Sequence, residues 1–247
     1  MWSQECSSPR KFRNFGQSMG KGKLVKWQEL ATFERVFEPT LQEAVDGTDY
    51  ELKGSWSQKV FGNDHPIVLE LGCGKGEYTL AQARRDPSRN YIGVDIKGQR
   101  VWRGAKTANE EEMQHVAFLR TRIEFVDRYF GPNEVSEIWL TFSDPQPKDE
   151  KGTKRITSSV FIEKRYRKFL KPGSLIHVKS DSPLLYQLTK EGYEEAGYDI
   201  VYDSSDVYGE LIHRVPDDLR ELLEVKTFYE QMWLEEGRKI HYLQIRI

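Results

Sequence analysis

The feature that most constrains the fold is an alternation of short apolar runs with longer amphipathic stretches from residue 66 onward. Seven runs have the length and composition of strands: 67–71, 91–96, 116–119, 137–142, 175–179, 200–202 and 240–247. Five stretches between them read as helices: 76–85, 100–112, 160–170, 183–196 and 227–236. Strands that alternate with helices indicate crossover connections. The sequence therefore predicts an α/β fold with a mostly parallel seven-stranded sheet and helices on both faces.

The first 65 residues depart from that pattern. Residues 1–25 are rich in Ser, Lys and Arg and predict a flexible basic arm, and residues 26–65 predict an irregular appendage on a domain at 66–247. Residues 1–18 lack apolar periodicity, and Met19 then opens a Gly- and Lys-rich run that reads like a natural start. An organelle-targeting segment is the alternative for this basic, acid-poor stretch.

Charge is unevenly distributed, although the net charge is only -2. Residues 1–26 hold six basic residues and one acidic, and residues 146–171 hold nine basic and three acidic. In residues 203–236 the balance reverses, with ten carboxylates and three basic residues. A chain polarised in this way can present a basic face to phosphates. Each run could equally be a solvated helix face.

Composition disfavours several classes of protein. No stretch approaches the ~18 apolar residues of a membrane-spanning helix, and the start lacks the pattern of a secretory signal. The two cysteines, Cys6 and Cys73, cannot form a disulfide framework or a four-ligand zinc site. We therefore expect a cytoplasmic protein with no membrane partner and no metal.

The strongest local signal follows the first predicted strand, in Glu-Leu-Gly-Cys-Gly-Lys-Gly-Glu at 70–77. Gly72, Gly74 and Gly76 let the backbone approach a ligand with no side chain in the way. Asp95 closes the second strand, where a carboxylate accepts hydrogen bonds from two ribose hydroxyls. The pattern predicts a nucleoside-containing cofactor, and the alternative is a tight turn in some other sheet protein.

The charges beside the glycines bear on which cofactor binds. Glu77 stands where a dinucleotide loop needs a glycine beneath the pyrophosphate, and no Gly-Lys-Ser/Thr follows as in a nucleotide phosphate loop. The loop resembles that of the Rossmann-like methyltransferases, which implies S-adenosyl-L-methionine as the cofactor. Carboxylates at Glu70 and Glu77 suit the ammonium and sulfonium of that ligand.

The fourth predicted strand runs into a second motif, Ser-Asp-Pro-Gln-Pro-Lys at 143–148. Its two prolines make a rigid loop that presents Asp144 and Lys148 at the same edge of the sheet. Methyltransferases that act on amino groups usually carry an aromatic residue after the two prolines, and methylation of pyrimidine carbon 5 needs a cysteine nucleophile. This loop has no such aromatic, and neither cysteine is placed for that role.

Six segments together resemble the bacterial tRNA (guanine-N7-)-methyltransferases over about residues 54–247. In chain order they are Glu-Leu-Gly-Cys-Gly-Lys-Gly-Glu, Gly-Val-Asp-Ile, Phe-Ser-Asp-Pro-Gln-Pro-Lys, Lys-Arg-Ile-Thr, Val-Lys-Ser-Asp and Thr-Phe-Tyr-Glu. The resemblance implies methyl transfer from S-adenosyl-L-methionine to N7 of a guanine in the variable loop of tRNA. It implies tRNA as the partner and leaves both a monomer and a homodimer open.

The resemblance also implies roles for individual residues. Glu70, Asp95 and the glycine loop are implied as cofactor contacts, and Asp144 as the catalytic or guanine-binding carboxylate beside the cofactor. The implied substrate-binding residues are Lys148, Asp181, Thr227, Phe228, Tyr229 and Glu230. After the third strand, we expect backbone groups of Arg122 and Ile123 to contact the adenine end of the cofactor.

Most of these residues have a structural alternative. Asp144 could cap its own turn, and Lys148 could be a solvated loop lysine. Asp181 could be the N-cap of the next helix. Thr227 and Glu230 have the spacing of a capping box, which does not exclude a functional role.

The implied chemistry needs few residues. Guanine N7 already carries an in-plane lone pair, so catalysis is expected to rest on alignment and electrostatics rather than on a general base. Methylation gives the base a positive charge, which Asp144, with Asp181 and Glu230 behind it, would stabilise. The base has to leave its stack, and Phe228 or Tyr229 could receive it.

Two departures from the family pattern and two rival functions stay open. Gln146 replaces a tryptophan of many members, and residues 149–151 are less basic than usual. One rival is a methyltransferase that acts on another RNA position or on a non-RNA substrate. The other is a non-catalytic RNA-binding protein with an inactive cofactor loop.

Overall fold

The computed structural model describes residues 21–247, and only the backbone of residues 21–24. The predicted basic arm at residues 1–25 therefore lies largely outside the described residues. Residues 21–25, which we assigned to that arm, begin helix α1 (Lys21–Leu30). Within the described part of the chain, no helix is long and apolar enough to cross a membrane.

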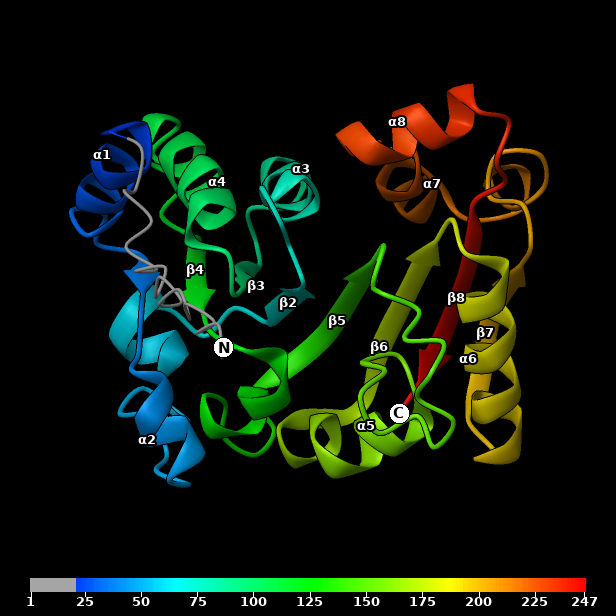
Figure 1. Ribbon diagram of the computed structural model, residues 1–247, viewed down its shortest axis with the longest axis horizontal. Coiled ribbons are helices and arrows are strands. Elements are labelled where there is room, and N and C mark those ends of the chain that lie inside the picture. The colour runs from blue at the N-terminus through cyan, green and yellow to red at the C-terminus, as the bar shows by residue number, and fades with distance from the viewer. Residues whose placement is uncertain (1–20) are drawn as a thin grey trace, which may run out of the picture.

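One mixed sheet forms the centre of residues 21–247 (Figure 1). Its strands lie in the order β1-β4-β3-β2-β5-β6-β8-β7, and every neighbouring pair is parallel except the two that involve β8. The strands are β1 (Val36–Phe37), β2 (Ile67–Leu71), β3 (Asn90–Asp95), β4 (Val116–Arg120), β5 (Val135–Thr141), β6 (Leu170–Ser180), β7 (Asp199–Ser204) and β8 (His241–Arg246). The chain winds in opposite directions on either side of the β2–β5 pair, and open α/β sheets bind ligands at such a point.

The seven predicted strands are confirmed, with β6 extended backward to Leu170. The predicted number of strands is corrected to eight, because β1 pairs in parallel with β4 at the edge of the sheet. Val36 lies opposite Phe118, and Phe37 lies opposite Leu119. A strand of two residues is too short to show the alternation by which strands are found in a sequence.

Helices cover both faces of the sheet. One face carries α1, α3 (Glu77–Arg85), α4 (Gly98–Glu110), α7 (Asp217–Leu223) and α8 (Phe228–Glu235). The other face carries α2 (Leu41–Val45), η2 (Ile123–Arg128), α5 (Ser159–Lys164), η3 (Tyr166–Lys168) and α6 (Pro183–Glu195), and two further short helices are η1 (Ser57–Phe61) and η4 (Leu211–His213). In Figure 1 the first group lies above the strands, and α2 and α5 lie below them. Four of the predicted helices are confirmed, and the fifth, at 160–170, is corrected to α5 and η3, because Leu170 already begins β6. Helices α1, α2 and α7 were not predicted.

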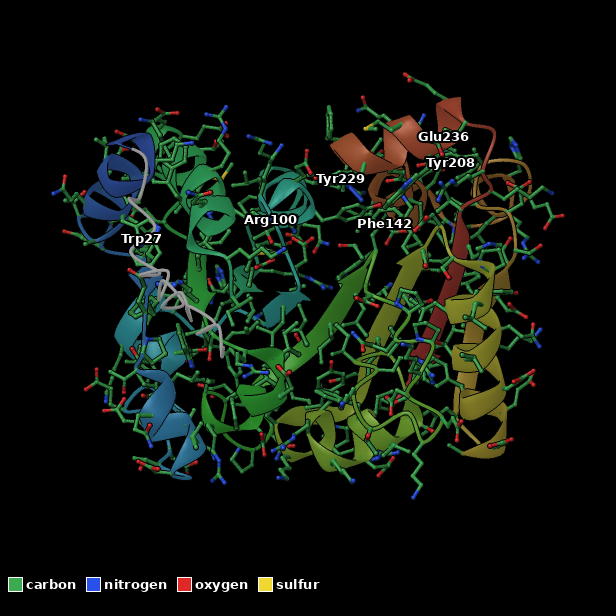
Figure 2. All side chains as sticks on the ribbon, in the orientation of Figure 1. Trp27, Arg100, Phe142, Tyr208, Tyr229 and Glu236 are labelled. Atoms are coloured by element: carbon green, nitrogen blue, oxygen red, sulfur yellow. The ribbon has the colours of Figure 1, made fainter. Side chains whose placement is uncertain are left out.

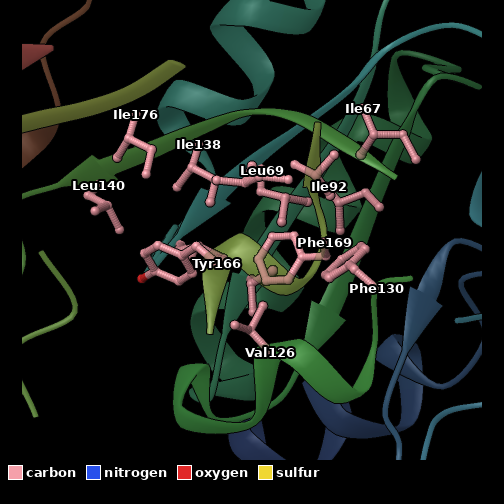
Figure 3. Packing of buried hydrophobic residues seen from close by; sticks show 14 of the residues in the cluster. Ile67, Leu69, Ile92, Val126, Phe130, Ile138, Leu140, Tyr166, Phe169 and Ile176 are labelled. Atoms are coloured by element: carbon pink, nitrogen blue, oxygen red, sulfur yellow. The ribbon is translucent and has the colours of Figure 1, made fainter. Parts of the chain in front are cut away.

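The central strands are buried on both faces. All residues of β2 and β3 are buried, which explains why their sequences are continuous apolar runs rather than alternating ones. Figure 3 shows isoleucines and leucines of four strands packed over a second layer, which is made of Val126, Phe130, Tyr166 and Phe169. This core fixes the strand ends that carry the candidate site.

The ring of Phe118 on β4 fills a tight space between three glycines. A Cβ atom would lie 2.8 Å from a ring carbon at Gly76, 2.8 Å at Gly93 and 2.7 Å at Gly104. Such distances are below ordinary van der Waals contact, so these positions accept a side chain only if their surroundings move. The contact brings the loop after β2, strand β3 and helix α4 close together.

Candidate active site

Two adjoining cavities lie at the carboxyl ends of β2 and β5. The larger cavity, of about 500 Å³, is lined by residues at the ends of β3, β4 and β5. The smaller, of about 300 Å³, is lined by the glycine loop and the start of α8. Gly72, Arg100, Thr141 and Phe142 line both cavities. Together they have the size of a site for a small ligand, at the place in the sheet where such sites are expected.

Backbone geometry shapes the glycine loop. Gly72 has a φ of 84°, in the left-handed region, and a Cβ there would meet nothing closer than Ile123 Cδ1 at 3.9 Å. A side chain at this position would therefore occupy cavity space. Asp95 holds the loop, because its Oδ2 accepts from Gly74 N at 3.0 Å and its Oδ1 accepts from Lys97 N at 2.7 Å. Each oxygen retains a lone pair for a ligand hydroxyl.

Glu70 is a buried carboxylate that joins three elements behind the smaller cavity. Its Oε2 accepts from Thr79 N on α3 at 2.8 Å, and its Oε1 accepts from the Thr141 hydroxyl on β5 at 3.0 Å. Burial raises the pKa of Glu70 to about 7, against the opposing effect of the Thr79 and Thr141 hydrogen bonds. A ligand cation in the smaller cavity would shift this group to its charged form.

The two cavities fit S-adenosyl-L-methionine, which carries a nucleoside at one end and an ammonium at the other. Asp95 and the Arg122–Ile123 segment, which the sequence predicts as contacts of the ribose and the adenine, line the larger cavity. Glu70, which the sequence predicts as a further cofactor contact, lines the smaller one. Sulfonium and ammonium charges suit a site with two buried carboxylates.

The loop after β5 has an unusual backbone. Phe142 and Gln146 adopt positive φ values of 54° and 46°, which residues other than glycine rarely do. Such conformations cluster at functional sites, where the surrounding structure enforces them. Asp144, which is exposed, lines the larger cavity, and its Oδ1 accepts from Gln146 N at 2.9 Å. The alternative that Asp144 caps its own turn is therefore confirmed, and its second oxygen has no such bond.

Two charged side chains hold this loop in place. Asp149 accepts from the backbone N of Thr153, Lys154 and Arg155, at 3.0, 2.6 and 2.9 Å. The nearly buried Arg155 donates to Pro145 O at 3.2 Å and to Asp149 O at 3.0 Å. Asp149, in the segment that we expected to be more basic, therefore has a local role in folding the loop.

Helix α8 forms the wall of the smaller cavity opposite the glycine loop. Thr227 is its N-cap and forms a capping box with Glu230, so that alternative is confirmed. Phe228 N donates to Glu77 Oε1 at 3.3 Å, which joins α8 to the first turn of α3. Tyr229 and Trp233 line the cavity, and the Trp233 ring lies 5.1 Å from that of Phe142. Figure 2 shows Phe142 beneath the end of α8 that carries Tyr229.

The structure brings together nine of the predicted site residues around the two cavities: Glu70, Gly72, Gly74, Asp95, Arg122, Ile123, Asp144, Thr227 and Tyr229. The other five line neither cavity. Gly76 is buried against Phe118, and Glu230 is buried in an ion pair with Lys179. Lys148 and Phe228 are exposed beside the site.

Asp181 forms an ion pair with Arg238 at 3.1 Å. The alternative that Asp181 is the N-cap of α6 is wrong, because the Ser182 side chain accepts from Leu185 N in that position. Asp181 remains at the carboxyl end of β6, on the same edge of the sheet as the two cavities.

Sequence reasoning missed several side chains that line the cavities, among them Arg100, Thr141, Phe142 and Trp233. Thr141 and Phe142 stand at the end of β5, just before the Ser-Asp-Pro motif, and that position is a usable signal. Cys73 also lines the smaller cavity, and burial raises the pKa of its thiol well above the usual range. A thiol held protonated is a poor nucleophile, whereas Cys6 lies outside the described residues.

The basic segment at 146–171 divides into two parts in the structure. Lys148, Lys154 and Arg155 belong to the loop beside the cavities, where Lys154 lines the larger one. Residues 163–168 lie just before β6, at the opposite ends of the strands, where Asp127 pairs with Arg165 and Lys168, and Lys171 lies in β6 itself. Only the first part can contribute to a phosphate-binding surface around the site.

A third cavity, of about 490 Å³, lies between α3 and α7, away from the carboxyl ends of the strands. Within its lining, Arg89 pairs with Glu137 at 2.5 Å, and Arg85 pairs with Glu221, which lies outside the lining, at 2.9 Å. We assign no ligand to it.

Residues 64–243 match a protein family described as a putative methyltransferase. A tRNA (guanine-N(7)-)-methyltransferase of Bacteroides thetaiotaomicron is 49% identical over 93% of this chain and 87% of that protein. The protein of the same name from Christiangramia forsetii is 45% identical over 92% and 98% of the two chains. One from Clostridium acetobutylicum is 32% identical over 81% of this chain and 88% of that protein.

Solved structures of similar fold are more distant in sequence. The 16S rRNA methyltransferase KamB superposes with a TM-score of 0.56 at 17% identity, over 77% of this chain and 91% of that chain. A structure described as an antibiotic-related methyltransferase gives a TM-score of 0.51 at 15% identity, over the same shares. At such identities the likeness shows the methyltransferase fold.

Proposed function

The chain belongs to the family of the tRNA (guanine-N(7)-)-methyltransferases, and on this premise we propose that its two cavities hold the cofactor and the target guanine. The enzyme transfers a methyl group from S-adenosyl-L-methionine to N7 of a guanine in tRNA. We place that guanine in the variable loop of the tRNA. The observation that carries the assignment of the site is the position of Asp144, which lines the same cavity as Asp95.

The cofactor side of the site consists of side chains and backbone already held in position. Asp95 would accept from the ribose hydroxyls, and Arg122 and Ile123 would border the adenine. Glu70 would hold the ammonium from behind the smaller cavity. Bound in this way, S-adenosyl-L-methionine supplies an electrophilic methyl group on a sulfonium. The protein contributes its orientation, because a linear approach of N7 is the main requirement of the transfer.

The guanine side would be formed by Asp144 and the aromatic wall. Asp144 keeps one carboxylate oxygen without a partner inside its loop, and that oxygen would accept from the guanine edge. Its charge would stabilise the base as the base becomes a cation. Tyr229, Trp233 and Phe142 line the adjoining cavity and would receive the unstacked ring. Thr227, at the start of the same helix, borders this space.

Residues at the rim would contact the rest of the tRNA. Exposed Lys148 is suited to a phosphate, and exposed Phe228 to stacking on a neighbouring nucleotide. Asp181, which directly follows β6, would approach the bound base from the side opposite to Asp144 and its loop. Substitution of each residue by alanine, with tRNA binding as the readout, would test these roles.

We further propose a division of the chain into an arm at 1–25, an appendage at 26–65 and the methyltransferase domain at 66–247. The arm would add phosphate contacts outside the active site. We propose that the enzyme acts in the cytoplasm as a monomer or homodimer, and that it needs no metal, because guanine N7 is already a nucleophile. Sedimentation of the protein with and without tRNA, and activity after chelation, would test these points.

The decisive experiment is incubation with labelled S-adenosyl-L-methionine and bulk tRNA, followed by nucleoside analysis. We expect label in 7-methylguanosine, because the loop lacks the aromatic of amino methylation and the thiol of Cys73 is held protonated. Label confined to 1-methylguanosine or N2-methylguanosine would contradict this proposal. Label in protein and none in tRNA would favour the alternative of a non-RNA substrate.

A further inference from the structure

A fully buried ammonium lies behind the wall that faces the proposed guanine position. Lys179 on β6 has no exposed side-chain surface, and neither has its partner Glu230 on α8. Lys179 Nζ lies 2.6 Å from Glu230 Oε1, 2.7 Å from Leu223 O and 2.5 Å from the Tyr78 hydroxyl. Three acceptors at these distances can take all three protons of the ammonium.

These contacts join parts of the site that are far apart in sequence. Tyr78 belongs to the first turn of α3, directly after the glycine loop, whereas Leu223 ends α7 and Glu230 belongs to the first turn of α8. A second link between the same helices is the bond from Phe228 N to Glu77 Oε1. The Lys179–Glu230 pair therefore lies where the cofactor side and the tRNA side of the site meet.

Glu230 is separated from the proposed base position by its burial. Its Oε1 accepts from Lys179 and from the Tyr208 hydroxyl at 2.7 Å, and its Oε2 accepts from Thr227 N at 3.3 Å. The residue is fully buried and does not line either cavity. Its neighbours on α8, Tyr229 and Trp233, do line the smaller cavity.

We propose that Lys179 is a positioning residue, which holds α8 through Glu230 so that Tyr229 and Trp233 face the cofactor loop at the right distance. Glu230 accordingly affects tRNA binding because its ion pair with Lys179 holds α8 in position, and it does not contact guanine. The inference rests on the proposed function, since it assigns the α8 wall to the bound base. It adds Lys179 to the residues on which that function depends.

The energetics of buried ion pairs provide a specific test. Loss of one partner leaves an uncompensated charge in the interior, whereas replacement of both partners by neutral side chains of similar size is often tolerated. Lys179→Met and Glu230→Gln should therefore each disturb α8, and the double variant should be less disturbed than either one. If Glu230 instead contacted the substrate, the double variant would stay impaired, because Lys179→Met cannot restore a lost contact between residue 230 and the substrate.

The experiment measures kcat and KM for tRNA, and S-adenosylhomocysteine affinity by calorimetry, in the wild type, the two single variants and the double variant. We expect each single variant to raise KM for tRNA by about tenfold or more, with cofactor affinity changed by less than about threefold. The double variant should recover most of that loss. Lys190→Met is the matched control, because it breaks a Lys–Asp203 pair of the same 2.6 Å length outside the site and should leave both constants unchanged.

The opposite pattern would overturn the proposal. If Glu230→Gln lowers kcat at saturating tRNA and Lys179→Met restores nothing, then Glu230 contacts the substrate. Should a single variant fail to fold, Tyr208→Phe gives a milder test, because it removes one donor to Glu230 without changing any charge. This variant should also raise KM for tRNA, by a few-fold, and an unchanged KM would count against a positioning role of the Lys179–Glu230 pair. The wild-type nucleoside assay tests the proposed function separately.

Discussion

The two sides of the active site are built in different ways. The cofactor side comes from the ends of three neighbouring strands, β2, β3 and β4, and its shape depends on glycine backbone and on Asp95 bound to backbone N–H groups. The tRNA side combines an irregular loop after β5 with α8, which begins at Phe228. The loop is held by its own residue Arg155, and α8 is held by Lys179 from the distant strand β6. The comparison indicates that the cofactor side depends on the ends of neighbouring strands, whereas the tRNA side depends on a loop and a helix that side chains hold in place.

The largest expected effect separates the two sides by the step that each controls. Asp144→Asn keeps the shape of the loop but removes charge where the guanine cation develops, and we expect turnover to fall by about 10²-fold with cofactor affinity nearly intact. Asp95→Ala removes the ribose acceptor and two backbone hydrogen bonds, and it should mainly weaken cofactor binding. Single-turnover rates and calorimetry with S-adenosylhomocysteine distinguish the two. An equal loss of cofactor affinity in both variants would contradict the division.

A smaller effect is expected from pH on the affinity for the cofactor product, and it tests the role of Glu70 on the cofactor side. The pKa of Glu70 is raised to about 7 by burial, so folding of the free protein favours its protonated form. This contribution to stability is present at low pH and is lost as pH rises through 7. A bound ammonium favours the carboxylate instead. Affinity for S-adenosylhomocysteine should therefore rise with pH, by up to about tenfold per unit below pH 7, and then level off.

Calorimetry from about pH 5.5 to about pH 8.5 measures this dependence, and proton release on binding near pH 6 provides a second readout. Glu70→Gln should flatten the profile and lower affinity at the alkaline end. Glu124→Gln is the control, since that exposed carboxylate borders the larger cavity and should leave the profile unchanged. A flat wild-type profile would show that Glu70 does not exchange its proton on binding.

The smallest effect concerns the N-terminal arm at residues 1–25, which we assign to the tRNA side only because it is rich in basic residues. Deletion of residues 1–18 should change little. Deletion of residues 1–26 removes three more lysines and should weaken tRNA binding, with a decrease of about one unit in salt slope for each phosphate interaction that is removed. This longer deletion also removes the first turns of α1, so thermal melting and cofactor affinity serve as controls. Identical salt slopes for all three proteins would exclude the arm from the tRNA site.

The same contrast explains what could be predicted from the sequence. The sequence placed Gly72, Gly74 and Asp95 together because each stands at or just after the end of a predicted strand, and all three line the two cavities. The mostly parallel sheet followed from the alternation of strands with helices, whereas the order of the strands was not predicted. The burial of Glu230 could not be found in this way, since nothing near it in sequence shows that Lys179 approaches from β6. Likewise, Trp233 becomes a cavity residue only because α8 packs above Phe142.

The packing around Phe118 limits how this enzyme can change over evolutionary time. Replacement of Gly76 is opposed by its positive φ of 72° as well as by the ring, and replacement of Gly104 is opposed by Lys75 O, which would lie 2.7 Å from the new Cβ. At Gly93 the obstacles are side chains alone: the Phe118 ring and Cys73 Sγ at 3.0 Å. Of the three, Gly93 is therefore the one that could become alanine after residue 118 had first become smaller. Because residue 118 has to change before residue 93, lineages that keep Phe118 should also keep Gly93.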